Sequence, residues 1–525
     1  MNKREKYTAG IDFGTLSARA VVADTADGTI YGEAVLEYPH AVITDNLPEG
    51  FALQDPNDYI EALKVVLRQA AEDAGISMSD IKGVGVDFTS CTLFPVDEDM
   101  TPLCFKEEFK DEPHAMVKLW KHNSTVSEAE EINAYAKSSG DEWLKYYGGK
   151  MTAEMGLPKI LEVRNRAPRV YEAAFRFIEA GDYVSYLLTG SEVHSACFSD
   201  FKYAHSRNGF PKGEFYRPIC EKLSDDIKYV SEPAGTVGSS GAELTGLSEG
   251  TAVSLSMIDC HASLPALNVT HAGDFLMVLG TSGCHMAHME KLVPVKGICG
   301  CTYDAVMPRL ATYEAGQSAV GDVFDWFVKN DVPGWCYDEA GKEGKNIHEW
   351  LSEKASVLTP GETGLVGVEW LLGNRSILSD SSRRGVMTGI SIRTRPWEVY
   401  RAWLEAVAFG TKVIVDNYEE NGIMIRQLKA TGGISVKNPL FMQILADVLG
   451  KEIKVADVAQ SAALGSAIYA ASAAGVYEDV YKASDRMSCK EYITYTPVEE
   501  SVRAYAKIYQ RYRKLYGFFG NRDND

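Results

Sequence analysis

The feature that most constrains this fold is a pattern that occurs twice, about half the chain apart. Residues 7–17 read as an apolar strand, a turn containing glycine and threonine, and the start of a second strand. Residues 274–285 repeat this order, with glycine, threonine and serine in the turn. The repeat predicts two similar domains that face each other across a cleft, and chance similarity of two hairpins is the alternative.

Strand and helix patterns alternate along most of the 525 residues, which is typical of an α/β protein. Asp55-Pro56 predicts the start of a helix, and the apolar segment 81–87 predicts a strand inside a sheet covered on both faces. A small-residue helix is expected over 462–474. The tyrosines at helical spacing in 501–517 favour core packing over a partner-binding helix.

Charge and cysteine content exclude several classes of function. The 53 basic and 73 acidic residues give a net charge of −20, which disfavours binding to nucleic acid or anionic membranes. The ten cysteines include no CxxC pair, so reduced thiols are expected. No apolar stretch reaches the roughly 18 residues of a membrane helix, and the first residues carry no signal-peptide core. A cytoplasmic location is the resulting expectation.

The two turns are candidate phosphate-binding elements. The chain contains neither a Walker A loop nor a GxGxxG fingerprint after a strand, so a nucleotide would need another device. Gly14 allows a close backbone approach, Thr15 offers a hydroxyl, and Asp12 could face Mg²⁺. The second turn offers the same chemistry, and the two together could clamp a triphosphate; it consists of Gly280, Thr281 and Ser282. An ordinary hairpin is the alternative for each turn.

Two further motifs could complete such a site. Asp259 follows an apolar stretch and precedes small residues, which suits a general base at a strand-to-helix junction. A helix N-cap is the alternative interpretation of Asp259. Gly432-Gly433 follows a strand and would let a flat base approach the backbone, which suggests an adenosine pocket; a simple turn is the alternative.

In this order, these motifs resemble the FGGY carbohydrate kinases of the sugar kinase/Hsp70/actin superfamily. The segment Gly385–Glu405 is similar to that family's second signature, although Trp403 is bulkier than the usual residue. Within the family the chain is most similar to the L-ribulokinases, through the segments 83–92, 113–121, 296–300, 314–322 and 410–414. The resemblance implies two ribonuclease H-like domains across a cleft, over residues 1–270 and 271–525.

The resemblance also implies roles for single residues. Asp259 would be the catalytic base, and Ser90, Lys202 and Glu314 would bind the sugar together with it. Asp12 would lie at Mg²⁺. The nucleotide would be bound by Gly14, Thr15, Gly280, Thr281, Ser282, Gln317, Gly432, Gly433 and Asn438. Departures at His122-Asn123 and Gly156-Leu157 lie near the expected sugar wall and leave the sugar preference open.

The expected activity is ATP-dependent phosphorylation of a ketopentose, first of all L-ribulose to L-ribulose 5-phosphate in arabinose catabolism. An FGGY kinase for another sugar or polyol, such as D-ribulose or xylulose, is the first alternative. An ATP-driven chaperone or filament and a non-catalytic sugar sensor are remote alternatives. The expected partner is a small sugar, without nucleic acid or membrane, and the family resemblance adds a homodimer.

Overall fold

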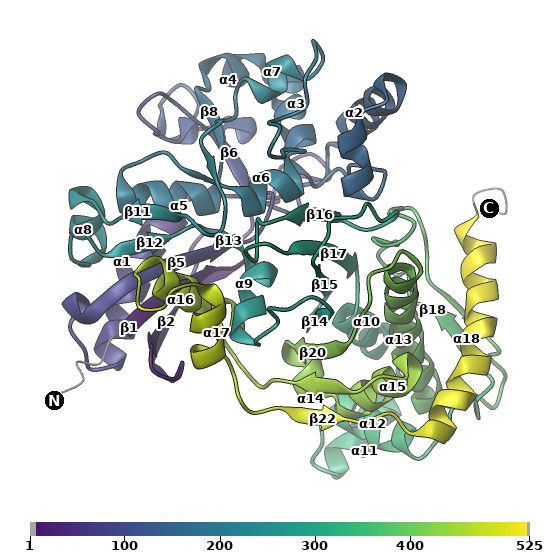
Figure 1. Ribbon diagram of the computed structural model, residues 1–525. Helices are drawn as coiled ribbons and strands as arrows, with labels where there is room; N and C mark the ends of the chain where they lie inside the picture. The colour runs from purple at the N-terminus through teal and green to yellow at the C-terminus, as the bar shows by residue number, and fades with distance from the viewer. Residues whose placement is uncertain (1–6, 522–525) are drawn as a thin grey trace.

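The computed structural model describes residues 7–521, which form two large sheets with helices around them (Figure 1). The first sheet belongs to the N-terminal half and contains seven strands. In spatial order they are β11 (Pro233–Thr236), β12 (Ala252–Ser254), β5 (Ile81–Phe88), β1 (Tyr7–Phe13), β2 (Ser17–Asp24) and β3 (Ile30–Glu37), with β13 (Met257–Ile258) also paired to β5. Helix α1 (Pro56–Asp73) covers one face, and Asp55 caps it by accepting a hydrogen bond from Asn57 N–H, as the sequence predicts.

The second sheet also has seven strands and belongs to the C-terminal half. Its order is β16 (Gly300–Tyr303), β17 (Ala311–Gln317), β15 (Gly283–Met289), β14 (Asp274–Leu279), β20 (Gln427–Thr431), β21 (Ile453–Val455) and β22 (Ile493–Tyr495). Helices α10 (Gly321–Asp331), α13 (Pro396–Glu420) and α15 (Pro439–Leu449) pack around it. The two sheets therefore carry separate hydrophobic cores.

The predicted repeat is a repeat of topology. β1 pairs antiparallel with β2 and parallel with β5, while β14 pairs antiparallel with β15 and parallel with β20. The next strands also correspond, since β12 lies parallel to β5 and β21 lies parallel to β20. The two hairpin turns consequently occupy equivalent ends of equivalent strands.

One C-terminal helix returns to the N-terminal sheet. Helix α16 (Ser461–Ala473) lies against β1, β5 and helix α9 (Asp259–Ala266), as Figure 1 shows. Its contacts explain the glycines of these strands: a Cβ at Gly10 would lie 1.7 Å from Ala463 O, and one at Gly85 would lie 2.1 Å from Ser466 O. Helix α16 thus adds a C-terminal segment to the core of the N-terminal domain. The predicted domain boundary at 270/271 stays a prediction.

We expect Gly10→Ala to destabilise the protein by about 3 kcal/mol or more, because the new methyl overlaps the backbone of α16 and neither element can yield without repacking. Thermal unfolding followed by circular dichroism measures the effect. Gly334→Ala is the control: a Cβ at Gly334 has no other atom within 4 Å, so the melting temperature should stay nearly unchanged. Gly75→Ala is unsuitable because Gly75 has a positive φ of 65°. Equal melting temperatures for Gly10→Ala and the wild type would contradict the close packing of α16.

The middle of the chain forms a third, smaller layer with its own hydrophobic cluster. A four-stranded sheet in the order β4 (Leu53–Gln54), β7 (Val117–Lys118), β6 (Leu93–Val96) and β8 (Arg176–Glu179) carries it. Helices α2 (Val126–Ser139) and α3 (Gly156–Arg166) belong to this layer, in the upper part of Figure 1. This middle region is thus folded, with short elements.

The long C-terminal helix α18 (Glu499–Gly520) packs along the C-terminal domain, and Tyr505, Tyr512 and Tyr516 are buried in its core. This confirms core packing as the role of the tyrosine series. All ten cysteines lie within the described range and are free thiols. Between residues 7 and 521, no helix combines the length and the apolar character that crossing a bilayer requires.

Candidate active site

The first turn joins β1 to β2 and is held from two sides. Gly14 N–H donates to Ser17 O at 2.9 Å, which closes the turn. Gln54 Nε2 donates to Thr15 O at 2.8 Å, and Trp120 Nε1 donates to Thr15 Oγ1 at 3.1 Å. The turn that the sequence predicts as a phosphate hairpin therefore has a fixed backbone, partly exposed to the cleft.

The second turn has the same construction. Gly280 N–H donates to Ser282 O at 2.9 Å, and the start of α10 closes on it, since Val320 N–H donates to Thr281 O at 2.7 Å. Gly280 O also accepts from Gly321 N–H at 3.0 Å. Thr281 is exposed and Ser282 is half-buried, so both hydroxyls remain available to a ligand.

A pair of carboxyl groups lies beneath the first turn. Asp12 on β1 and Asp87 on β5 occupy paired positions of adjacent parallel strands. Burial raises the pKa of Asp12, against the effects of Asp87 and of Arg19, which lies 3.3 Å away. Burial and then the Asp12 charge raise the pKa of Asp87 well above its usual range. Among the described residues none hydrogen-bonds Asp87 Oδ1, whereas Ser466 Oγ donates to Oδ2 at 2.6 Å.

Sequence reasoning did not assign Asp87 to the site. The signal was available: Asp87 ends an apolar strand as Asp12 does, and parallel neighbouring strands bring such residues to the same edge of a sheet. Two buried carboxyl groups with one unpaired oxygen form a donor set that suits a hard divalent cation such as Mg²⁺.

Asp259 is the first residue of α9, and the charges of Asp12, Glu314 and Lys202 all act on its carboxyl group. Burial and then the Asp12 charge raise its pKa to about 7, although Cys260 N–H donates to Asp259 Oδ1 at 2.6 Å. Glu314 also raises the pKa of Asp259, and Lys202 lowers it. A carboxylate that titrates near neutral pH has the proton affinity a general base needs.

Lys202 and Glu314 form a buried ion pair between the two halves of the chain. Lys202 ends α6 (Ala196–Lys202), and Glu314 lies on β17. Lys202 Nζ is 3.1 Å from Glu314 Oε1 and 2.9 Å from Oε2. His261 Nε2 lies 3.2 Å from Oε2, and Arg375 Nη2 lies 3.5 Å from Oε1. Burial opposes both charges, yet the pKa of Lys202 is raised by Glu314 and that of Glu314 is held well below its usual range by Lys202.

A cavity of about 380 Å³ opens beside this pair and is lined from both domains. Ser90 and Lys202, which the resemblance assigns to the sugar, border it together with Ser282 of the second hairpin. Asn123, one of the departures expected near the sugar wall, also lines it, and sequence reasoning assigned no role to two further lining residues with polar groups, Trp120 and Arg375. The structure thus brings the sugar and phosphate candidates to one cleft.

Of the three residues predicted to lie near the nucleoside, two belong to a glycine turn and the third caps a helix. Gly432 has φ +98°, and a Cβ there would lie 2.5 Å from Leu279 O, so this turn requires glycine. Gly433 has open space around it. The Asn438 amide oxygen instead caps α15 by accepting from Phe441 N–H at 3.0 Å.

Gln317 is buried away from these glycines. Its side-chain oxygen accepts from Thr411 Oγ1 at 2.8 Å, and His285 Nε2 lies 3.0 Å from that oxygen. Its Nε2 donates to Val407 O at 3.1 Å. These contacts give Gln317 a packing role, and its predicted contact with nucleotide stays a prediction.

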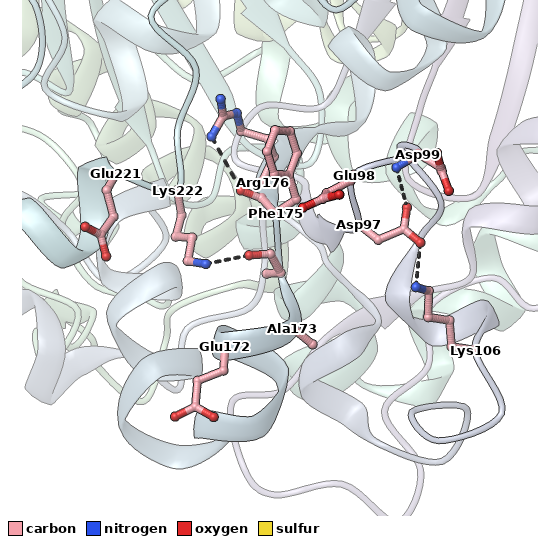
Figure 2. A pocket seen from close by; sticks show the side chains of 11 residues that line it. Asp97, Glu98, Asp99, Lys106, Glu172, Ala173, Phe175, Arg176, Glu221 and Lys222 are labelled. Carbon is pink, nitrogen blue, oxygen red and sulfur yellow. Dashed lines mark hydrogen bonds and ion pairs between the residues drawn. The ribbon is translucent and has the colours of Figure 1, made fainter.

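A second hollow, of about 660 Å³, lies at the surface of the middle layer (Figure 2). Its two lysines are engaged by neighbouring groups: Lys106 Nζ lies 2.6 Å from Asp97 Oδ2, and Lys222 Nζ donates to Ala174 O at 2.6 Å. No residue predicted from the motifs borders it. The cleft between the domains is therefore the candidate active site.

Comparison with known proteins agrees with this geometry. The N-terminal domain of the FGGY family of carbohydrate kinases matches residues 7–264, and its C-terminal domain matches residues 275–474. Proteins named ribulokinase from Geobacillus thermodenitrificans and Halalkalibacterium halodurans are each 42% identical to this chain, over 99% of it and 96% of their own length.

Solved structures share the fold. A xylulose kinase from Rhodospirillum rubrum matches with a TM-score of 0.82 at 23% identity, over 98% of this chain and 100% of its own. A gluconate kinase from Lactobacillus acidophilus matches with a TM-score of 0.82 at 18% identity, over 99% of each chain. The predicted fold, two α/β domains of the sugar-kinase type, is confirmed. With two family domains matched in order and relatives aligned over nearly its full length, the chain belongs to the FGGY family of carbohydrate kinases.

Proposed function

We propose that this kinase transfers the γ-phosphoryl group of ATP to the terminal hydroxyl of a ketopentose, L-ribulose, and forms L-ribulose 5-phosphate. The observation that carries the proposal is that the buried Asp259 carboxyl is close enough to Asp12 of the first hairpin and to the Lys202–Glu314 pair for the charges of all three to act on it. The relatives named ribulokinase support ribulose as the sugar.

The chemistry follows from what these groups can do. Lys202 donates to sugar oxygens and Glu314 accepts from sugar hydroxyls, which fixes the sugar beside Asp259. The Asp259 carboxylate accepts the proton of the 5-hydroxyl. The hydroxyl oxygen bonds to the γ-phosphorus as the bond between that phosphorus and the ADP oxygen breaks. Backbone N–H groups and hydroxyls of the two hairpins, at Thr15, Thr281 and Ser282, hold the phosphate oxygens.

The proposal includes Mg²⁺ at Asp12 and Asp87. Two buried carboxyl groups with raised pKa values and the unpaired Asp87 Oδ1 fit a hard divalent cation. When bound, Mg²⁺ would offset negative charge on the phosphates. Arg19, 3.3 Å from Asp12, offsets part of the negative charge of this pair.

Other parts of the proposal rest on the family resemblance and on composition. Gly432 and Gly433 would face the nucleoside and Gly14 and Gly280 the phosphates, with Gln317 and Asn438 supporting the nucleotide-binding domain. The enzyme would act in arabinose catabolism as a cytoplasmic homodimer, in keeping with its ten unpaired cysteines.

The test is ADP release with Mg-ATP and a panel of L-ribulose, D-ribulose, L-xylulose, D-xylulose, ribitol and glycerol. We expect L-ribulose to give the highest kcat/KM, and ADP release without sugar to be a small fraction of that rate because closure excludes water. A different preferred sugar would keep the mechanism and reject L-ribulose. If folded, ATP-binding protein releases ADP at the same rate with each sugar as without sugar, the proposed kinase activity is rejected.

A further inference from the structure

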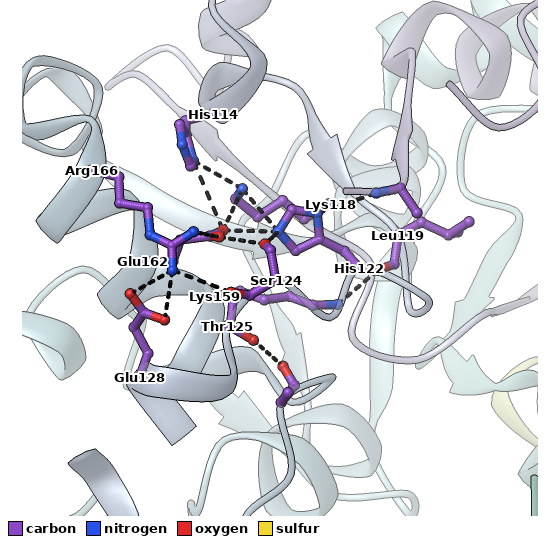
Figure 3. A network of polar contacts seen from close by, with 12 residues as sticks. His114, Lys118, Leu119, His122, Ser124, Thr125, Glu128, Lys159, Glu162 and Arg166 are labelled. Atoms are coloured by element: carbon purple, nitrogen blue, oxygen red, sulfur yellow. Dashed lines mark hydrogen bonds and ion pairs between the residues drawn. The ribbon is translucent and has the colours of Figure 1, made fainter. Parts of the chain in front are cut away.

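A buried polar network lies behind the cavity wall, centred on Glu162 of α3 (Figure 3). Lys118 Nζ lies 2.9 Å from Glu162 Oε2, and His122 Nε2 lies 2.8 Å from the same oxygen. Lys118 Nζ is also 3.1 Å from His114 Nδ1. On the outer side, Arg166 Nη1 donates to Glu162 Oε1 at 3.1 Å. Glu162 and His122 have no exposed surface, and Lys118 is 2% exposed.

Burial and mutual contacts shift the pKa values of the groups in this network. Burial lowers the pKa of His122 to about 3 and that of His114 to about 4, so both imidazoles are neutral. Burial opposes ionisation of Glu162, but the His122 hydrogen bond and the Lys118 charge hold its pKa well below the usual range. Ala52 N–H donates to His122 Nδ1 at 3.4 Å, which leaves the Nε2 proton for Glu162. Burial lowers the pKa of Lys118, and the Glu162 charge opposes that shift. The interior therefore contains a buried Lys118–Glu162 pair whose carboxylate also contacts a neutral histidine.

This network holds one short loop, residues 119–123. Lys118 precedes the loop and His122 lies within it. A second buried lysine, Lys159 of the same helix α3, donates to Leu119 O at 2.8 Å and to Cys91 O at 2.5 Å. It thereby ties the loop to the strand end that carries Ser90. Asn123 N–H donates to Gly50 O at 2.9 Å at the far end.

The same loop contacts both halves of the reaction site. Trp120 Nε1 donates to Thr15 Oγ1 in the first phosphate hairpin. Trp120 and Asn123 also line the cavity that contains Lys202. A rigid displacement of the loop would therefore change the cavity wall and the position of Thr15 together.

We propose that Glu162 and Lys118 are positioning residues that set the 119–123 loop, so that sugar recognition and the phosphate hairpin are coupled through Trp120. Buried ion pairs contribute little net stability compared with apolar residues of equal size, whereas they can specify one arrangement of the chain. Here the arrangement is the position of the 119–123 loop, which lines the cavity and contacts Thr15. The inference rests on the proposed function, because it needs a sugar in the cavity.

The test compares kinetics and stability of Glu162→Gln, Lys118→Met and the double variant with the wild type. We expect each single variant to raise the KM for L-ribulose by about tenfold or more and to reduce the stimulation of ADP release by sugar. The KM for ATP should change less than about twofold. The single effects should not add in the double variant, because both remove the same constraint.

Trp120→Phe tests the same coupling even if the Glu162 and Lys118 variants fold poorly. It keeps an aromatic ring but removes the donor to Thr15 Oγ1, so kcat with sugar should fall while the melting temperature stays near that of the wild type. Glu128→Gln is the matched control: Glu128 is also a buried carboxylate that binds Arg166, but among the described residues its side-chain hydrogen bonds go to Arg166 and Ser127 and not to the 119–123 loop. Its kinetic constants should equal those of the wild type.

The outcomes separate the two proposals. A wild type with no sugar-dependent ADP release overturns both. An active wild type, together with Glu162→Gln and Lys118→Met variants that melt earlier but keep the wild-type sugar KM and sugar stimulation, overturns only the positioning role. An unchanged kcat in Trp120→Phe overturns the coupling through Thr15.

Discussion

Asp259→Asn will lower the sugar-dependent kcat by about 10²–10⁴-fold, the range typical of a lost general base. Asparagine keeps the size of the side chain and can still accept from Cys260 N–H, so the start of α9 should be preserved. The KM for ATP should stay within about twofold, since Asp259 takes the sugar proton and does not hold phosphate. A coupled assay of ADP release at saturating L-ribulose measures the change. A variant with more than about a tenth of wild-type kcat would assign the proton to another acceptor.

The raised pKa of Asp259 predicts two further effects, one on the pH dependence of wild-type activity and one on the melting temperature of Asp259→Asn. Activity of the wild type should rise with pH and level off above about 7, because only the ionised carboxylate accepts the proton. The effect on stability has the opposite direction. Between the ordinary value of 3.8 and about 7, the folded state binds the Asp259 proton more tightly than the unfolded state, so ionisation destabilises the fold as pH rises. We therefore expect Asp259→Asn to melt at a higher temperature than the wild type at pH 8, with the difference lost below pH 4.

Local sequence signals were sufficient to predict the two hairpins and the elements that carry Asp12 and Asp259. Strand periodicity, a proline at the first helical turn and glycine in a turn act over a few residues, so the sequence displays them directly. The topology that repeats around β1 and β14 follows from these two hairpins once each gains a parallel neighbour. The resemblance then added Lys202 and Glu314, which lie 112 residues apart and meet in the cleft.

What sequence reasoning missed depends on long-range register. Asp87 becomes a partner of Asp12 only because β5 lies parallel to β1 in that register. The 119–123 loop gains its position from Glu162 and Lys159, about 40 residues further along the chain. Gly156, a departure from the expected pattern, has a steric reason: a Cβ there would lie 2.0 Å from the Tyr203 ring, next to Lys202. Such constraints exist only between folded elements.

Glu314→Gln and Lys202→Met will both lower kcat/KM for the sugar by about 100-fold or more, mainly through KM, because each removes a charged group that we propose to bind the sugar. They should differ in stability. Without Lys202, Glu314 keeps His261 at 3.2 Å and Arg375 at 3.5 Å. Without Glu314, Lys202 stays buried with no other carboxylate among its described ion pairs.

An unpaired buried charge costs about 3–5 kcal/mol, so Glu314→Gln should be the less stable single variant. The double variant, Lys202→Met with Glu314→Gln, should recover stability relative to Glu314→Gln alone while remaining inactive, because the uncompensated ammonium is gone. Chemical denaturation of the four proteins at pH 7, beside sugar kinetics, separates these effects. Equal destabilisation by the two single changes, adding in the double variant, would mean that the pair is not coupled across the domains. A sugar KM unchanged in both single variants would remove Lys202 and Glu314 from the sugar site and leave them only the task of joining α6 to β17.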